Sequence, residues 1–156
     1  MSTDFLQALG TNGYLLSSPL TVLTTEMNSL ATGSYTALGP QHTQSDIAQG
    51  IRGSVFFKSG GSFTPTSSLV PVLYGWFARS PDGGTTYEYS TTLTRLYDFI
   101  IPLPQAAISS GQLFAASGVN LPLAAEYWKL IILNSCGATL PASGNSVFIG
   151  PTAWQY

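Results

Sequence analysis

The sequence predicts an all-β fold, a β-sandwich or jelly roll of about eight short antiparallel strands. Several short segments alternate apolar and polar residues with the period of two that a half-buried strand requires. Clusters of Gly, Pro, Asn and Ser separate these segments, and no long stretch has a helical period. The 156 residues predict one domain, large enough to bury roughly two thirds of its unfolded surface without a disulfide.

The first expected elements are an N-terminal arm over residues 1–18 and a strand from Pro19 to Met27, where Leu and Val alternate with Thr. A connection from Asn28 to Ser45 follows, and a loop that long is typical of a functional or interface segment. The next predicted strand runs from Gly50 to Lys58. In that strand Phe56 falls among outward-facing polar residues, which makes it a candidate contact residue.

The clearest element is the stretch from Leu69 to Ser90, LVPVLYGWFARSPDGGTTYEYS. Its first half is apolar at both alternating sets of positions, which predicts a strand covered on both faces. A structural turn at Asp82, Gly83 and Gly84 is expected to follow, because Asp bonds its downstream backbone and Gly accepts positive φ. The second half would then return as the other strand of a hairpin.

The rest of the chain predicts further strands and a second hairpin, on the same alternation and turn signals. The expected strands are Thr91 to Ile101, a short pair formed by Gln112 to Ala116 and Val119 to Leu121, and a hairpin of Tyr127 to Asn134 with Asn145 to Ile149.

The chain therefore divides into an arm (1–18), a β-sandwich domain (19–151) and a short C-terminal tail (152–156). The tail is too short to bury its own two aromatic residues, so these are expected to dock on this or a neighbouring subunit. The candidate interface residues of the whole chain are Phe5, Leu6, Tyr14, Tyr35, Phe56, Trp154 and Tyr156.

The composition indicates assembly with other chains. Only 8% of the residues are charged and 44% are apolar, whereas soluble domains usually carry about 25% charged residues. A surface with so little charge is weakly protected against association. The alternative is a monomer that its many Ser, Thr, Gly, Gln and Asn residues keep in solution. The basic residues are scattered, which argues against nucleic acid as a direct partner, and no apolar run is long enough for a membrane helix.

The sequence gives little support to catalysis, so the protein is expected not to be an enzyme. His42 is the only histidine and Cys136 the only cysteine, and neither lies in a recognisable nucleophile motif. The acidic residues are spread singly, so neither a metal site nor a cofactor is predicted. A carbohydrate platform is a real alternative, and the aromatic residues proposed to line it are Trp76, Tyr87, Tyr89 and Tyr97.

Two segments carry a resemblance to a known group of proteins. ARSPDGGTTYE, from Ala78 to Glu88, resembles a strand-turn signature of small structural proteins of tailed bacteriophages and prophages. YWKLIILNSCGATLPASGNSVFIGP, from Tyr127 to Pro151, is similar to their carboxy-terminal pattern, with Cys136 where that pattern has Thr. Together the two segments cover about a quarter of the chain.

The resemblance implies a virion protein made in the host cytoplasm and located on the outer capsid surface. We expect a capsid decoration (cement) protein that binds the major capsid protein, stabilises the assembled shell, and forms a homotrimer or another closed oligomer. The alternatives are a head-fibre or tail subunit, or a carbohydrate-binding adhesion module on the virion. The resemblance transfers no catalytic residue.

Overall fold

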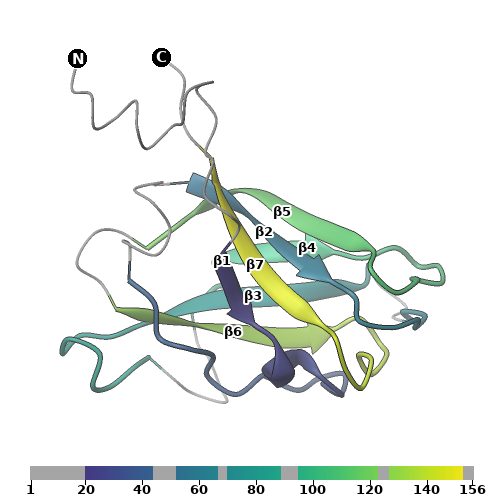
Figure 1. Ribbon diagram of the computed structural model, residues 1–156, viewed down its shortest axis with the longest axis horizontal. Helices are drawn as coiled ribbons and strands as arrows, with labels where there is room; N and C mark the ends of the chain where they lie inside the picture. Colours follow the sequence, from purple (N-terminus) through teal and green to yellow (C-terminus); the bar gives the residue numbers. More distant parts are fainter. Residues whose placement is uncertain (1–19, 44–51, 67–69, 89–94, 123–126, 153–156) are drawn as a thin grey trace.

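The computed structural model is a sandwich of two antiparallel sheets, which confirms the predicted all-β class (Figure 1). It describes residues 20–43, 52–66, 70–88, 95–122 and 127–152. In order across the first sheet lie β1 (Leu20–Leu23), β7 (Ser146–Thr152), β2 (Arg52–Lys58) and β5 (Leu113–Asn120). The second sheet has the order β4 (Phe99–Pro102), β3 (Val72–Arg79) and β6 (Trp128–Ser135).

The core lies between the two sheets, where each strand contributes alternate apolar side chains. Phe57 of β2, Phe77 of β3 and Trp128 of β6 are all fully buried. The Phe77 and Trp128 rings meet edge to face with centroids 5.3 Å apart. As the sequence predicted, β3 is covered on both faces, because Leu73 and Phe77 face the core while Trp76, on the other face, is only 5% exposed.

Gly75 of β3 allows the two-sheet core to close around Phe99 of β4. The two residues are register partners, and the Phe99 ring lies directly over the glycine. A Cβ built on Gly75 would overlap three carbon atoms of that ring. The absence of a side chain at this position therefore makes room for a core aromatic residue.

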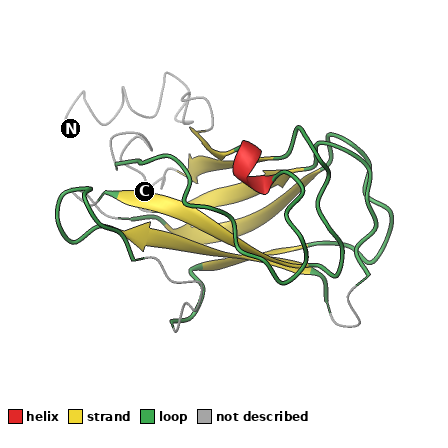
Figure 2. Cartoon of the chain, turned by 90° about the horizontal axis from the view of Figure 1, so that it is seen from below, coloured by secondary structure: helices red, strands yellow, loops and turns green. Residues whose placement is uncertain are grey.

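The long connection after β1 closes one side of the sandwich. It begins with a single 3-10 turn, η1 (Thr25–Met27), seen in red in Figure 2, so the predicted first strand ends at Leu23 rather than Met27. Residues 33–42 then run along the edge of β6, and their backbone hydrogen-bonds β6 from Trp128 to Asn134. A Cβ on Gly39 would touch both β1 and β6, so this edge-covering segment also fills the gap between the two sheets.

The predicted hairpin of residues 127–134 with 145–149 is wrong, because β6 and β7 lie in different sheets. The intervening loop carries the chain across the sandwich. Alternation predicts which side chains of a strand face the core, and β6 and β7 do face the same core. Alternation does not predict which other strand each of them pairs with. The buried Asn145, which directly precedes β7, fixes the crossing: its side chain donates to Pro141 O at 2.6 Å and accepts from Gly60 N at 3.0 Å.

Three further expectations need correction. After β3, residues 85–88 are not a strand; one bond from Glu88 N to Arg79 O continues the pairing, and β3 pairs with β4 and β6 instead. Of the strand predicted to begin at Thr91, only its end from Phe99 lies in β4, and 95–98 form no strand. The predicted short pair around residue 117 is one strand, β5, with a bulge that places residues 117–118 opposite a single residue of β2.

Among the described residues, no helix is long and apolar enough to cross a membrane.

We expect Gly75→Ala to lower the free energy of unfolding by about 1–3 kcal/mol, because the new methyl group overpacks the core against Phe99. Denaturant unfolding followed by tryptophan fluorescence measures the change. In the double variant Gly75→Ala/Phe99→Leu the loss should be smaller than the sum of the two single losses. Additive losses would show that the ring and the new methyl group do not compete for one space.

Candidate functional site

The turn after β3 is organised by the carboxylate of Asp82. Oδ1 accepts from the backbone N–H groups of Thr85 and Thr86 at 3.1 and 2.7 Å, and Oδ2 accepts from the Thr86 hydroxyl at 2.8 Å. Gly83 and Gly84 have φ of +71° and +97°, which glycine adopts without strain. In the structure the three turn residues singled out from the sequence thus make one compact hydrogen-bonded loop at the surface.

The same hydrogen bonds lower the pKa of Asp82 below its usual value, first through the backbone N–H and then through the hydroxyl of Thr86. Because the folded-state pKa is the lower one, the carboxylate stabilises the turn above its unfolded-state pKa. That contribution is lost as the pH falls through the folded-state pKa. This acidic residue has a structural explanation that requires no cation.

Arg95 and Asp98 extend the pairing of β3 with side chains instead of backbone. Phe77 N donates to Asp98 Oδ2 at 2.7 Å, and Arg95 Nη2 donates to Phe77 O at 2.9 Å. The two side chains bond each other at 2.9 Å, and Arg95 also reaches Glu88 at 3.3 Å. Burial alone lowers the pKa of Arg95, but the Asp98 hydrogen bond and both carboxylates outweigh it and raise that pKa.

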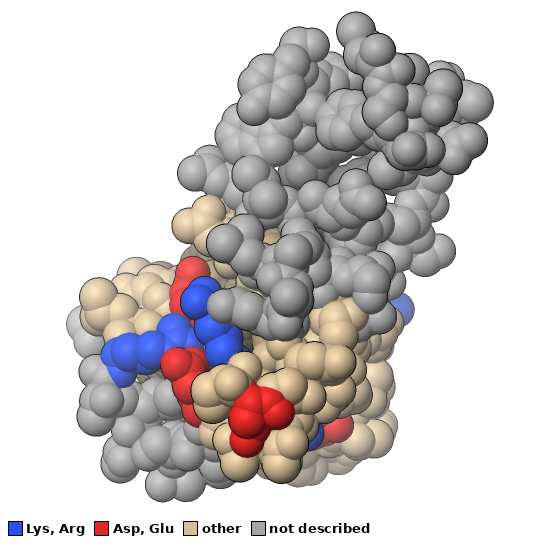
Figure 3. Space-filling view, turned by 90° about the vertical axis from the view of Figure 1, so that its left-hand side faces the viewer, with Lys and Arg blue, Asp and Glu red and all other residues tan. Residues whose placement is uncertain are grey.

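Sequence reasoning missed this ion network, since it treated the acidic residues as isolated. The spacing of Arg95 and Asp98, three residues apart, was the only local signal, and Glu88 joins them through the fold. Figure 3 shows that basic and acidic side chains lie beside one another on this face, and that most other described residues there are uncharged. Several of the few charges therefore neutralise one another.

An aromatic cluster covers the outer face of the three-stranded sheet. Tyr74 and Trp76 of β3 lie with centroids 6.4 Å apart, Tyr35 contacts Trp76 at 5.8 Å, and Tyr97 contacts Tyr74 at 4.8 Å. Tyr97 is 41% exposed. The Trp76 indole donates to Arg95 O at 3.3 Å and is nearly buried, so the tyrosines form the accessible part of the cluster.

An apolar stripe lies on the outer face of the four-stranded sheet. Phe56 of β2 stacks on Phe148 of β7 with centroids 5.5 Å apart, and Ala115 of β5 is the register partner of Phe56 on its other side. Leu113, on the same face of β5, is 56% exposed. The sequence singled out Phe56, whereas its stacking partner was recognised only as a strand residue.

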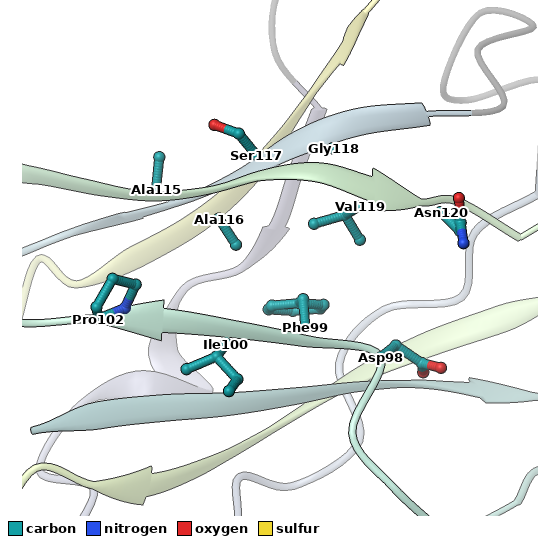
Figure 4. Close-up of a pocket in the computed structure, with 10 residues that line it drawn as sticks. All are labelled: Asp98, Phe99, Ile100, Pro102, Ala115, Ala116, Ser117, Gly118, Val119 and Asn120. Carbon is teal, nitrogen blue, oxygen red and sulfur yellow. The ribbon is translucent and has the colours of Figure 1, made fainter. Parts of the chain in front are cut away.

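A groove opens between β4 and β5, the last strands of their sheets on one side of the sandwich (Figure 4). It has a volume of about 360 Å³. The side chains of Ala116 and Val119 point toward β4, and Phe99 points toward β5, so these three form its floor. Most of the other side chains that line it are small or uncharged.

The other predicted residues are placed as follows. Tyr35 lies in the edge-covering segment and bridges to Leu133. His42 is buried in that segment, with its ring 4.9 Å from the Trp128 ring. Cys136 is buried in the core, and burial raises the pKa of its thiol, which makes it a poor nucleophile. Tyr89 and five candidate interface residues lie outside the described part of the chain: Phe5, Leu6, Tyr14, Trp154 and Tyr156.

Buried Asn134 lies within the second resemblance segment and joins its loop to the connection after β1. Its amide nitrogen donates to Leu30 O and Ala138 O, both at 2.8 Å, and its amide oxygen accepts from Cys136 N at 3.0 Å. Every polar atom of this fully buried amide is therefore satisfied.

Within the described ranges, no three His, Cys, Asp or Glu residues converge to hold a metal ion. Comparisons of this chain with protein-family models, with curated proteins and with solved structures found no match.

We expect Asp98→Ala to lower the free energy of unfolding by about 1–3 kcal/mol, because it leaves Phe77 N–H without its acceptor and Arg95 without the nearer of its two carboxylates. Chemical denaturation measures the loss. Asp82→Ala is the matched control: it removes a carboxylate from an exposed turn and should cost less. Equal losses would mean that the ion network contributes no more than the surface turn.

Proposed function

We propose that this protein is a non-enzymatic virion structural protein, a decoration (cement) protein on the outer surface of an icosahedral capsid. Its partners would be the major capsid protein and other copies of itself in a homotrimer or another closed oligomer. The observation that carries the proposal is the apolar stripe of Phe56, Phe148 and exposed Leu113 on a chain with 8% charged residues. The resemblance of the two turn-centred segments supports the same assignment.

The mechanism of such a protein is thermodynamic. A protein that binds the assembled shell but not its free subunits stabilises the shell by mass action. At one hundred times the dissociation constant, that stabilisation is about 2.7 kcal/mol per site. An oligomer that binds several shell subunits at once gains further through effective concentration. This mechanism needs no catalytic group.

Mixing the purified protein with empty shells of a candidate parent phage tests this proposal. We expect saturation at a regular stoichiometry and a rise in the melting temperature of the shell. Leu113→Glu places a charge in the apolar stripe and should weaken binding at least tenfold, because burial of a leucine contributes about 1.5–3 kcal/mol.

The matched control is Leu96→Glu, the same substitution at a leucine that is 83% exposed near the other sheet, which should leave shell binding unchanged. Binding only at the vertices or on the tail would identify a fibre or tail subunit instead. A protein that ignores every part of the particle would refute the structural role.

The aromatic cluster favours a second candidate function, a carbohydrate-binding adhesion module. Sugar rings stack on exposed aromatic faces, and Tyr97 presents such a face beside the half-buried Tyr74. Of the residues expected to line a platform, Trp76 and Tyr97 belong to this cluster. Tyr87 does not belong to it: its hydroxyl donates to Gln41, and Lys129 Nζ lies 4.5 Å from its ring centre.

Titration with host-surface oligosaccharides, followed by tryptophan fluorescence, tests this second candidate. Since Trp76 lies 6.4 Å from Tyr74, a sugar on the cluster should change its emission. Tyr97→Ala should then weaken binding about tenfold, whereas the control Tyr87→Ala should not. An emission that no oligosaccharide changes, or equal losses in both variants, would reject the aromatic cluster as a sugar site.

A further inference from the structure

The two sides of the sandwich, where the edges of the sheets lie, differ in how the chain covers them. On the β6 side, the edge-covering segment of residues 33–42 supplies backbone partners to the last strand and fills the space beside β1. On the other side, β4 and β5 are the last strands of their sheets, and no described residue pairs with the outer edge of β4 or with that of β5 from Leu113 to Val119. The groove lies between these two edges.

The groove has the features of a site for an added strand. Its floor of Phe99, Ala116 and Val119 is apolar and each of these residues is at most 8% exposed, whereas its rims are strand backbones. Unpaired strand edges present rows of N–H and C=O groups that an extended segment can pair with. Small residues of β5, such as Ala115 and Ser117, leave that backbone open to approach.

We propose that the N-terminal arm of a second copy, residues 1–18, binds in this groove as an extended segment that pairs with the edge of β5. This inference deepens the proposed function by naming the contact that joins the subunits, and it rests on the self-assembly in that proposal, not on shell binding.

The sequence of the arm suits the groove. Residues 5–18 carry no charge, so burying them between the sheets involves no desolvation of an ion. The segment Tyr14-Leu15-Leu16 offers consecutive apolar side chains for the floor and for the exterior. Of the residues that line the groove only Asp98 is charged, and Arg95 already neutralises it.

The arm also leaves the fold at the end of the sheet where β5 ends. Leu20 pairs with Ile149 near the end of β7, and Arg52 of β2 pairs with both Thr152 of β7 and Asn120 of β5. The arm and the end of β5 therefore share one end of the four-stranded sheet. A fully extended arm of 18 residues reaches about 60 Å, far beyond the roughly 14 Å between β1 and β5.

The arm continues from β1, at the edge of its sheet opposite β5. Its length permits it to cross the end of the sheet to its own groove as well as to enter a neighbour's, and we place it in the neighbour's. One arm and one groove at opposite edges of each copy then make a head-to-tail contact, which closes into a ring when the rotation allows it. In such a ring every groove holds one arm and every arm is bound.

Sedimentation velocity on the full-length protein, without shells, tests the inference. The double variant Tyr14→Asp/Leu15→Asp should dissociate the oligomer, with at least a tenfold rise in the dissociation constant. The matched control Ser2→Asp/Thr3→Asp adds the same charge beside Asp4 and should assemble like the unaltered chain. An unaltered chain that is monomeric at all concentrations, or an arm variant that assembles normally, would overturn the proposal.

A mixing experiment distinguishes exchange from an arm that folds into its own groove. Ala116→Leu fills the groove from its floor, and its melting curve reports whether the fold survives. If it does not, Val119→Met, a milder filling of the same floor, replaces it. Arm variant and groove variant should each be monomeric, yet their mixture should form a two-chain species, because one intact arm meets one intact groove. Absence of the two-chain species would refute exchange. Loss of shell binding with an intact oligomer would refute only the cement role.

Discussion

The structure depends on hydrogen-bond partners for the backbone groups along the edge of β6, the strand that carries the largest core residue. Residues 33–42 have no periodicity of their own, yet their backbone bonds β6 at Trp128, Leu130, Ile132 and Asn134. The Thr36 hydroxyl accepts a further bond from Ile132 N at 3.0 Å. Because an uncovered strand edge would either take up water beside the core or pair with another chain, this segment determines where the sandwich ends.

Alternation in the sequence predicted the strands that lie fully between polar turns. The predicted segments for β2 and β3 agree with the structure because their apolar residues must face a core at every second position. The partners of strands were not predictable in the same way. Both β6 and β7 look like arms of one hairpin, but β6 pairs with β3 and β7 pairs with β1 and β2, so they lie in different sheets.

The candidate sites likewise differ in whether their residues are close together or distant along the chain. The Asp82 turn is local, so residue types within five positions contain all of its chemistry. The Arg95 network and the groove between β4 and β5 bring together residues that are distant along the chain, and no local pattern marks them. Phe56 was recognisable because it breaks an outward polar pattern, but the stack that it forms with Phe148 depends on the register of β2 with β7.

Asn145 also affects how the molecule reaches its fold. Its side chain joins backbone groups that are 85 and 118 residues away in sequence, at the end of the sandwich opposite the arm. Contacts between such distant segments form only after the entropy of closing very long loops has been overcome. The pairing of Leu20 with Ile149 at the other end closes a still longer loop, so both ends of the first sheet should form late in folding, after the nearer pairing of β3 with β4. The four-stranded sheet is thus the part of the molecule that needs the whole chain before it can close.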